Sequence, residues 1–206
     1  MNICLFGATG RVGRKIMNLV IEDGHKVTAL IRDPANFSFR HEQLKIIKGD
    51  AMSAAAVRKA VHGNDAVISS LSTGNTTTLS DSMPSIINAM EEEGIKRIVT
   101  IGTAGILDSR IESGKLRYQT SESRRKSTAA AEEHEKAYSI LKKSRLDWTV
   151  ACPTYLPEGP STGKYRVEKN LLPIGGVKIS TGDTAAFTYN ELAEKKFLCS
   201  RAGLAY

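Results

Sequence analysis

The sequence predicts an α/β fold in which helices cover a doubly wound parallel sheet, and three observations point to it. Short apolar runs without helical periodicity alternate with amphipathic stretches over about the first 150 residues. A glycine-rich turn directly follows the first of these runs. The length of 206 residues, with 41% hydrophobic and 25% charged residues, suits one domain with a sizeable core. We therefore expect residues 1–206 to form a single domain.

The opening of the chain predicts a buried strand, a tight turn and a helix. Residues 3–6 are apolar, and a glycine-rich turn follows them at once. The turn reads Gly7-Ala8-Thr9-Gly10-Arg11-Val12-Gly13. Glycine lets the chain leave the strand at Gly7, gives a pyrophosphate access to backbone N–H groups at Gly10, and lets the helix pack closely at Gly13. We expect this turn to bind a dinucleotide; the alternative is a plain glycine-rich turn.

Arg32 follows the second predicted strand, residues 26–31, where a dinucleotide-binding fold reads the cofactor ribose. An acid at this position hydrogen-bonds both ribose hydroxyls of NAD, whereas a guanidinium suits a 2′-phosphate. We therefore predict NADP(H) in preference to NAD(H). Arg11 is a second candidate for the same phosphate or for the pyrophosphate. The alternative is that Arg32 is a solvated residue paired with Asp33.

The third and fourth predicted strands end in residues that we place beside the cofactor. Residues 44–48 form the third strand, and we expect Asp50 and Ala51 to lie near the adenine. A helix over residues 53–62 leads to the fourth strand, residues 65–69. The small polar segment after it suits close contact with the cofactor riboses, and its contact residues are Leu71, Ser72 and Thr73.

The fifth predicted strand, residues 97–101, ends at the edge where a parallel sheet binds ligands. Gly102-Thr103-Ala104 follows it, and we expect these residues to contact the cofactor. The helix before this strand is marked by apolar residues from position 79 to position 90. Pro84 lies inside that pattern, which is tolerable only if it falls in or near the first turn.

Residues 108–126 form a long polar stretch beside the predicted cofactor edge. A loop of this length favours a lid over a substrate, and a disordered solvated loop is the alternative. Ser127 is the expected cap of a helix that runs to about Ser144. Its inward residues are Ala130, Ala137, Ile140 and Leu141. Residues 148–152 form the sixth strand.

The alternation of strands and helices is expected to stop at Pro153. Residues 153–160 are rich in turn-forming residues, and residues 164–168 and 177–180 are candidate short strands. Asp183 is the expected cap of a last helix that runs through Leu192. We interpret residues 153–206 as a substrate-side extension of the domain, a flap.

Charge and cysteine content limit the kinds of partner and metal that we expect. The net charge of +7 favours anionic partners. The basic residues are dispersed and lack an aromatic-studded face, which argues against specific nucleic-acid binding. No membrane-length apolar run or leader-like segment is present, so we expect a cytoplasmic protein without a membrane partner. Cys4, Cys152 and Cys199 lack metal-ligand spacing, and we expect no metal site.

These motifs together resemble the NmrA-like group of atypical short-chain dehydrogenases/reductases. The matching segments are residues 7–13, Leu30-Ile31-Arg32-Asp33, Gly49-Asp50, Asn64-Asp65-Ala66-Val67-Ile68 and Asp147-Trp148-Thr149-Val150-Ala151-Cys152-Pro153. Within that group the chain looks most like biliverdin-IXβ reductase/flavin reductase and the bacterial proteins classed as NADH-flavin reductases.

The resemblance implies a Rossmann-type sheet, bound NADP(H), and hydride transfer to a flat conjugated acceptor. Such acceptors are FMN, riboflavin, quinones and linear tetrapyrroles, and we expect an anionic one. Thr103 matches a serine that often lies near the substrate after the fifth strand of these reductases, and it is the candidate catalytic residue. It would orient the acceptor or relay a proton; the alternative is that it only bonds the cofactor amide or the backbone. We expect Pro153, Thr154 and Tyr155 to contact the cofactor. The expected substrate contacts are Tyr118, His134, Tyr155 and Leu156.

Tyr138 and Lys142 have the spacing of the superfamily's catalytic pair, but they lie near the end of their helix rather than near its start. We interpret them as a decoy. Hydride addition to a conjugated ring spreads the negative charge, so solvent can supply the proton, and a missing tyrosine favours flavin-like acceptors. Two interpretations stay open for each of two further side chains. His134 either reaches the substrate or has a structural or surface role. Tyr155 either stacks on the flat ring of the acceptor or packs against the protein.

Two alternatives to this reductase stay open. NmrA-like proteins include dinucleotide sensors that regulate a partner without turnover. A sugar or isoflavone-type carbonyl reductase would need a catalytic acid that we cannot place. The expected assembly is a monomer or a homodimer.

Overall fold

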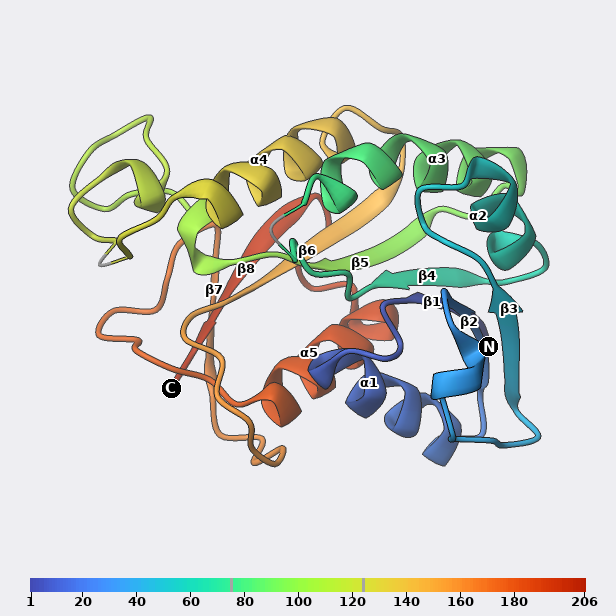
Figure 1. Ribbon diagram of the computed structural model, residues 1–206. Helices are drawn as coiled ribbons and strands as arrows, with labels where there is room; N and C mark the ends of the chain where they lie inside the picture. Colours follow the sequence, from blue (N-terminus) through green and yellow to red (C-terminus); the bar gives the residue numbers. More distant parts are fainter. Residues whose placement is uncertain (75, 124) are drawn as a thin grey trace.

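An eight-stranded sheet forms the centre of the computed structural model, which describes residues 1–74, 76–123 and 125–206 (Figure 1). The strands are β1 (Asn2–Phe6), β2 (Lys26–Ile31), β3 (Leu44–Lys48), β4 (Ala66–Ser69), β5 (Arg97–Ile101), β6 (Asp147–Pro153), β7 (Arg166–Lys169) and β8 (Ser200–Ala205). Their order is β3-β2-β1-β4-β5-β6-β8-β7, and every neighbouring pair is parallel except β7 with β8. This arrangement confirms the predicted doubly wound, Rossmann-type fold.

Helices cover both faces of the sheet. Figure 1 shows α2, α3 and α4 on one face and α1 and α5 on the other. The helices are α1 (Arg11–Glu22), α2 (Ala54–Val61), α3 (Thr78–Glu92), α4 (Ala129–Leu141) and α5 (Thr181–Glu194), and three single-turn 3₁₀ helices are η1 (Pro34–Asn36), η2 (Ala104–Ile106) and η3 (Arg117–Gln119). Two apolar clusters fill the layers between helices and sheet. Because the central strands are buried on both faces, they appear in the sequence as unbroken apolar runs.

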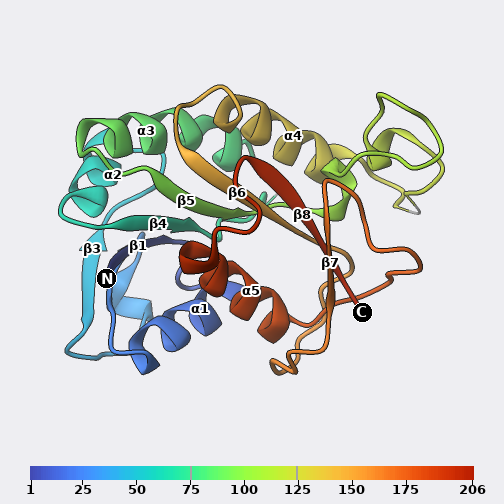
Figure 2. The same cartoon turned by 180° about the vertical axis from the view of Figure 1, so that it is seen from behind.

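Residues 153–206 continue the alternation of strands and helices, contrary to the prediction. Strand β8 pairs in parallel with β6, so α5 and β8 add another crossover unit (Figure 2). Strand β8 is fully buried, but its sequence, SRAGLA, contains no β-branched or aromatic residue that would mark a strand. Residues 177–180 contribute only one isolated bridge, between Tyr155 and Lys178.

Details of three helices also differ from expectation. Ser180, not Asp183, is the N-cap of α5, because its Oγ accepts the Asp183 N–H at 3.0 Å. Pro84 is the seventh residue of α3, beyond the first turn; it lies on the exposed side of the helix. Helix α4 begins at Ala129 after Thr128, so Ser127 is not its cap. Ala130 is exposed rather than inward.

Candidate dinucleotide and acceptor site

The glycine turn between β1 and α1 has the geometry of a phosphate cradle. Gly7 adopts a φ of +79°, which favours glycine, and its carbonyl accepts the Gly10 N–H at 3.0 Å. A Cβ on Gly13 would lie 2.1 Å from the Gly7 carbonyl oxygen and 2.7 Å from Ser70 Oγ. Gly13 is therefore required for helix packing against the end of the strand.

Gly10 has a different role, because a Cβ there would meet only the Gly7 carbonyl oxygen, at 3.3 Å. Gly10 is the N-cap of α1, and no side chain caps the helix at this end. The first-turn N–H groups of α1 thus have no side-chain acceptor at the cap, an arrangement that suits a pyrophosphate. The residues present fit a dinucleotide at this turn.

Arg32 and its neighbours lie at the ends of β2 and β3. Arg32 is exposed, and it forms no ion pair within the described ranges. Asp33 instead caps η1, accepting the Ala35 N–H at 3.2 Å and the Asn36 side-chain amide at 2.5 Å. The alternative Arg32–Asp33 pair is therefore not formed. Further along the same edge, Asp50 is partly exposed and Ala51 is buried.

The end of β4 lies against the glycine turn. Ser70 Oγ donates to the Phe6 carbonyl at 2.9 Å and to the Gly7 carbonyl at 3.2 Å. Leu71 is partly buried against the core, Ser72 is exposed, and Thr73 lines a large cavity. This segment thus connects the cradle to that cavity.

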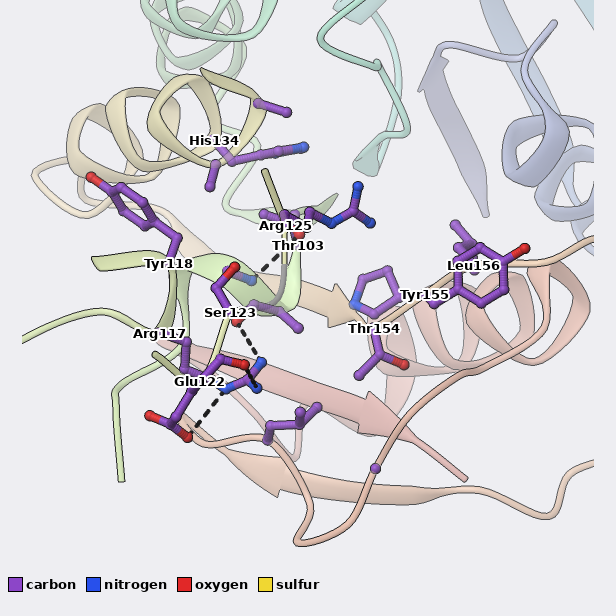
Figure 3. Close-up of a pocket in the computed structure, with 18 of the residues that line it drawn as sticks. Thr103, Arg117, Tyr118, Glu122, Ser123, Arg125, His134, Thr154, Tyr155 and Leu156 are labelled. Atoms are coloured by element: carbon purple, nitrogen blue, oxygen red, sulfur yellow. Dashed lines mark hydrogen bonds and ion pairs between the residues drawn. The ribbon is translucent and has the colours of Figure 1, made fainter. Parts of the chain in front are cut away.

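The cavity has a volume of about 930 Å³ and lies along the carboxyl edge of the sheet (Figure 3). It is lined by the glycine turn, the ends of β4, β5 and β6, the start of α4, the loop of residues 108–126 and residues 172–177. Of the predicted site residues, it brings together Arg11, Thr73, Gly102, Thr103, Ala104, Tyr118, His134, Pro153, Thr154, Tyr155 and Leu156. The other predicted residues, including Arg32 and Asp50, are not among its lining residues.

Thr103, which caps η2 just after β5, and His134 of α4 face the cavity (Figure 3). The Thr103 hydroxyl oxygen accepts the Gly105 N–H at 3.4 Å, which leaves its proton available for a ligand. Burial lowers the pKa of His134 to about 4. The imidazole is therefore neutral near pH 7 and offers one donor and one acceptor rather than a charge.

The end of β6 supplies the opposite wall. Pro153 is buried, and Thr154 Oγ1 is buried without a hydrogen-bond partner in the described part of the chain. Tyr155 is 64% exposed, so its ring is available for contact with a ligand rather than committed to the core. The Arg11 guanidinium donates to the Leu156 carbonyl at 3.1 Å, which links the glycine turn to this wall.

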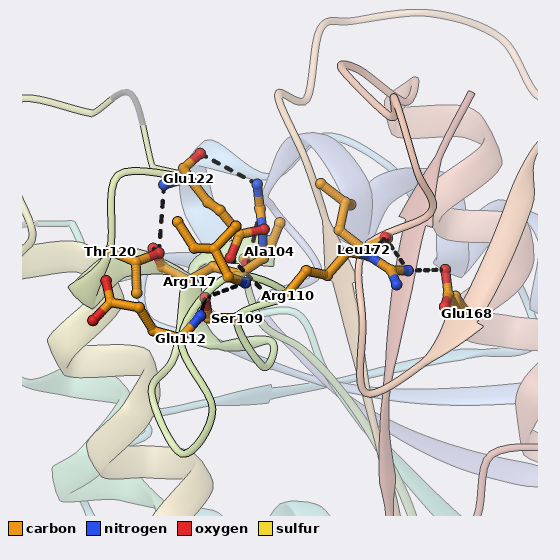
Figure 4. Close-up of polar contacts among 10 residues, drawn as sticks. Ala104, Ser109, Arg110, Glu112, Arg117, Thr120, Glu122, Glu168 and Leu172 are labelled. Carbon is orange, nitrogen blue, oxygen red and sulfur yellow. Dashed lines mark hydrogen bonds and ion pairs between the residues drawn. The ribbon is translucent and has the colours of Figure 1, made fainter.

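The loop of residues 108–126 is held by polar contacts (Figure 4). Arg117 Nε lies 3.5 Å from Glu122 Oε1, and Glu122 Oε2 accepts the Arg110 N–H at 2.9 Å. The Arg110 side chain donates to Glu168 of β7 and to the Leu172 carbonyl. These contacts tie the described part of the loop to the sheet, unlike the solvated loop considered as an alternative.

Tyr118 and Tyr138 have different surroundings. Tyr118 lines the cavity, and its hydroxyl donates to Glu135 Oε2, which raises its pKa. The Tyr138 ring packs edge-on against Trp148 at 5.7 Å and under the Arg201 guanidinium at 4.9 Å. Tyr138 is not among the lining residues of the main cavity, which agrees with its interpretation as a decoy.

Sequence reasoning missed the contribution of residues 172–177 and of Glu122 to this site. Residues 172–177 line the cavity, and Ile174 and Val177 are more than 70% exposed at its edge. The run Leu-Pro-Ile-Gly-Gly-Val was the available signal, because it places apolar residues among turn formers, where a surface loop is expected. Glu122 gave no signal, since its importance comes from contacts that only the folded loop creates.

The chain belongs to a family described as NAD(P)H-binding, whose model matches residues 7–195. Among solved structures, a candidate epimerase from Bacteroides thetaiotaomicron is 29% identical, with a TM-score of 0.85 over 100% of this chain and 96% of that chain. A candidate NADH-flavin reductase from Streptococcus pneumoniae is 22% identical, with a TM-score of 0.84 over 100% and 99%.

The anaerobilin reductase ChuY from Escherichia coli O157:H7 is also 22% identical, with a TM-score of 0.79 over 100% of this chain and 97% of that chain. At this identity the likeness concerns the fold. The family match confirms the NAD(P)H-binding family that the resemblance implied, and these neighbours share the Rossmann-type fold. Within the described residues, no helix is long and apolar enough to cross a membrane.

Proposed function

We propose that this protein is an NADP(H)-dependent reductase of flat conjugated acceptors, such as flavins, quinones or linear tetrapyrroles. The observation that carries the proposal is one cavity that begins at Arg11 of the phosphate cradle and extends past Thr103 and His134 to the exposed Tyr155. Such a cavity has room for the nicotinamide end of a dinucleotide and a second molecule beside it. The NAD(P)H-binding family and the reductases among the structural neighbours support the same class.

We assign the following roles to residues of the site. The glycine turn binds the pyrophosphate, and Arg32 binds the 2′-phosphate. Gly102, Pro153 and Thr154 position the nicotinamide, with the unpartnered Thr154 hydroxyl available to its amide. Tyr155 and Leu156 offer apolar surface to the acceptor. Bound NADPH supplies a hydride to an acceptor stacked against it.

The titratable groups of the cavity favour an acceptor that needs no strong acid. His134 is neutral, and the pKa of Tyr118 is raised by its bond to Glu135. Glu122 is ion-paired with Arg117, and its pKa is lowered. None of these three groups is a ready proton donor near pH 7, so an alkoxide would be poorly stabilised. A conjugated ring delocalises the charge and can take its proton from solvent or through the Thr103 hydroxyl.

The direct test is NADPH oxidation with FMN, riboflavin, a quinone and a linear tetrapyrrole as acceptors. We expect a saturable, protein-dependent rate with at least one of them. Tight NADPH binding without turnover of any acceptor would overturn the reductase and favour a dinucleotide sensor.

The preference for NADP(H) is tested by Arg32→Glu. The substitution removes charged hydrogen bonds to the 2′-phosphate and adds repulsion, so we expect the Kd for NADPH to rise about 10- to 100-fold. The Kd for NADH should change less than about twofold, because that ligand has no 2′-phosphate. Lys59→Glu, on the exposed face of α2, is the control with the same charge change. An equal loss of both ligands in Arg32→Glu contradicts the assignment.

An anionic acceptor is favoured by Arg125, which lies between His134 and Thr103 in the view of Figure 3. Arg110 and Arg117 have carboxylate partners, whereas Arg125 forms no ion pair with any residue that the structure describes. Its guanidinium is therefore available to a phosphate or carboxylate of the acceptor.

FMN and riboflavin provide a matched pair for this point, since only FMN carries a phosphate. We expect Arg125→Ala to raise the KM for FMN about fivefold and to leave the KM for riboflavin within about twofold. Lys143→Ala, on the surface after α4, controls for the lost charge. The same change for both flavins would mean that Arg125 does not recognise the anion.

A further inference from the structure

Arg201 carries a buried positive charge on β8, on the face of the sheet that α4 covers. Its side chain is only 7% exposed. One guanidinium nitrogen donates to the Ile106 carbonyl, and the other lies 2.6 Å from Asp108 Oδ1. The Cζ of the guanidinium lies over the Tyr138 ring, 4.9 Å from its centroid. Three groups from one region of the fold thus contact a charge that is costly to bury, while its Nε is buried without a partner among the described residues.

Two of these groups belong to the segment that joins Thr103 to the loop of residues 108–126. Ile106 ends the single turn η2, which begins immediately after Thr103. Asp108 is the first residue of the loop. Because Arg201 contacts both residues, it fixes the position of the segment between β5 and the loop. It thereby fixes the direction in which the loop begins.

Asn170 reinforces the same junction from the backbone. Its side-chain oxygen accepts the Arg201 N–H at 3.0 Å, and its N–H donates to the Arg201 carbonyl at 2.6 Å. Its own carbonyl accepts the Asp108 N–H at 2.9 Å. Asn170 adopts a φ of +61°, a left-handed conformation that asparagine tolerates better than most residues. The antiparallel pair β7–β8 is therefore joined directly to the base of the cavity wall.

We propose that Arg201 is a positioning residue for the acceptor side of the cavity: it holds residues 104–108, and through them Thr103 and the loop of residues 108–126. Only the kinetic consequence of this inference, a higher acceptor KM, rests on the proposed function. It also explains Tyr138, which is the aromatic support of the buried guanidinium instead of an acid. Arg201 lines no part of the cavity, so it acts through the residues that do.

Arg201→Lys tests the proposal, because an ammonium group retains the charge but lacks the planar fork whose two terminal nitrogens contact Ile106 and Asp108 separately. We expect the acceptor KM to rise about fivefold while the NADPH Kd stays within about twofold. Trypsin should cleave within residues 108–126 about tenfold faster, as expected for the loss of one charged hydrogen bond that opposes local opening. The cleavage assay needs no turnover, so it decides the positioning role even if the proposed function fails.

Arg97→Lys is the matched control. Arg97 is also 7% exposed and pairs with a carboxylate, Glu191 at 3.2 Å, but it lies at the opposite end of β5. We expect a comparable fall in Tm without faster loop cleavage or a higher acceptor KM. Equal loop cleavage in the two variants would overturn the proposal.

If Arg201→Lys fails to fold, Asp108→Ala removes one of the contacts from a side chain that is 47% exposed. It should reproduce the faster loop cleavage and the higher acceptor KM in a folded protein. Loop cleavage at the wild-type rate in Asp108→Ala would also contradict the proposal.

Discussion

Gly13→Ala should abolish dinucleotide binding and lower the stability of the fold. The added Cβ would lie 2.1 Å from the Gly7 carbonyl oxygen, a backbone atom that cannot move without displacing the cradle. Overpacking of this kind costs about 1–3 kcal/mol, and the turn that presents the N–H groups is displaced with it. We expect at least a roughly 100-fold rise in the NADPH Kd, measured by fluorescence titration, together with a lower Tm.

Gly10→Ala separates binding from folding. A Cβ at Gly10 would meet only one atom, 3.3 Å away, so the free protein should retain a Tm near the wild-type value. The methyl group would nevertheless occupy space over the first turn of α1 that a pyrophosphate needs. NADPH affinity should therefore fall strongly in a folded protein. Unchanged affinity in Gly10→Ala would show that no phosphate approaches this turn.

Asp183→Ala should be the most destabilising change outside the cradle. The carboxylate is completely buried and accepts the Thr162 N–H at 2.6 Å, the Gly163 N–H at 2.8 Å and the Tyr206 hydroxyl at 2.6 Å. It thereby ties residues 161–163 and the last residue of the chain to the start of α5. Leaving these donors unpaired should cost about 3 kcal/mol, or roughly 6–12 °C in Tm.

The same carboxylate predicts a pH dependence. Although burial opposes ionisation, hydrogen bonds from Tyr206, Gly163 and Thr162 hold the pKa of Asp183 at about 2, below its ordinary 3.8. Its contribution to stability is therefore complete above about pH 4 and is lost as the pH falls through about 2. Urea unfolding of Asp183→Asn and wild type should show a stability difference that shrinks over this range. Asp65→Ala removes an exposed carboxylate with one backbone bond and is the control.

The sheet could be predicted because its central strands are buried on both faces and leave unbroken apolar runs. Strand β8 could not, since Ser200, Arg201 and Gly203 look like a loop. Arg201 and Gly203 have tertiary reasons for their places in the sheet. Arg201 is satisfied by Ile106 and Asp108, and a Cβ on Gly203 would lie 2.0 Å from the Leu171 carbonyl oxygen. Such requirements arise between segments that are far apart in the chain, where periodicity carries no information.

The two ends of the candidate site differ in the same way. The glycine turn and Arg32 follow from short-range spacing, which a single sequence displays. The acceptor end depends on which polar groups pair with each other, as Arg117 does with Glu122. The burial that makes His134 neutral is likewise a property of the folded protein. Consequently, the sequence predicted His134 as a candidate but not its protonation state.

We expect the chain to hold a nicotinamide with one face toward an acceptor. This expectation is tested most directly with NADPH carrying deuterium on one face or the other of nicotinamide C4. Oxidation by an accepted flavin or tetrapyrrole should remove deuterium from only one of the two labelled forms, because the proposed contacts with Pro153 and the Gly102–Thr103 edge would fix the ring. Equal removal from both faces, at the rate seen without protein, would contradict the account.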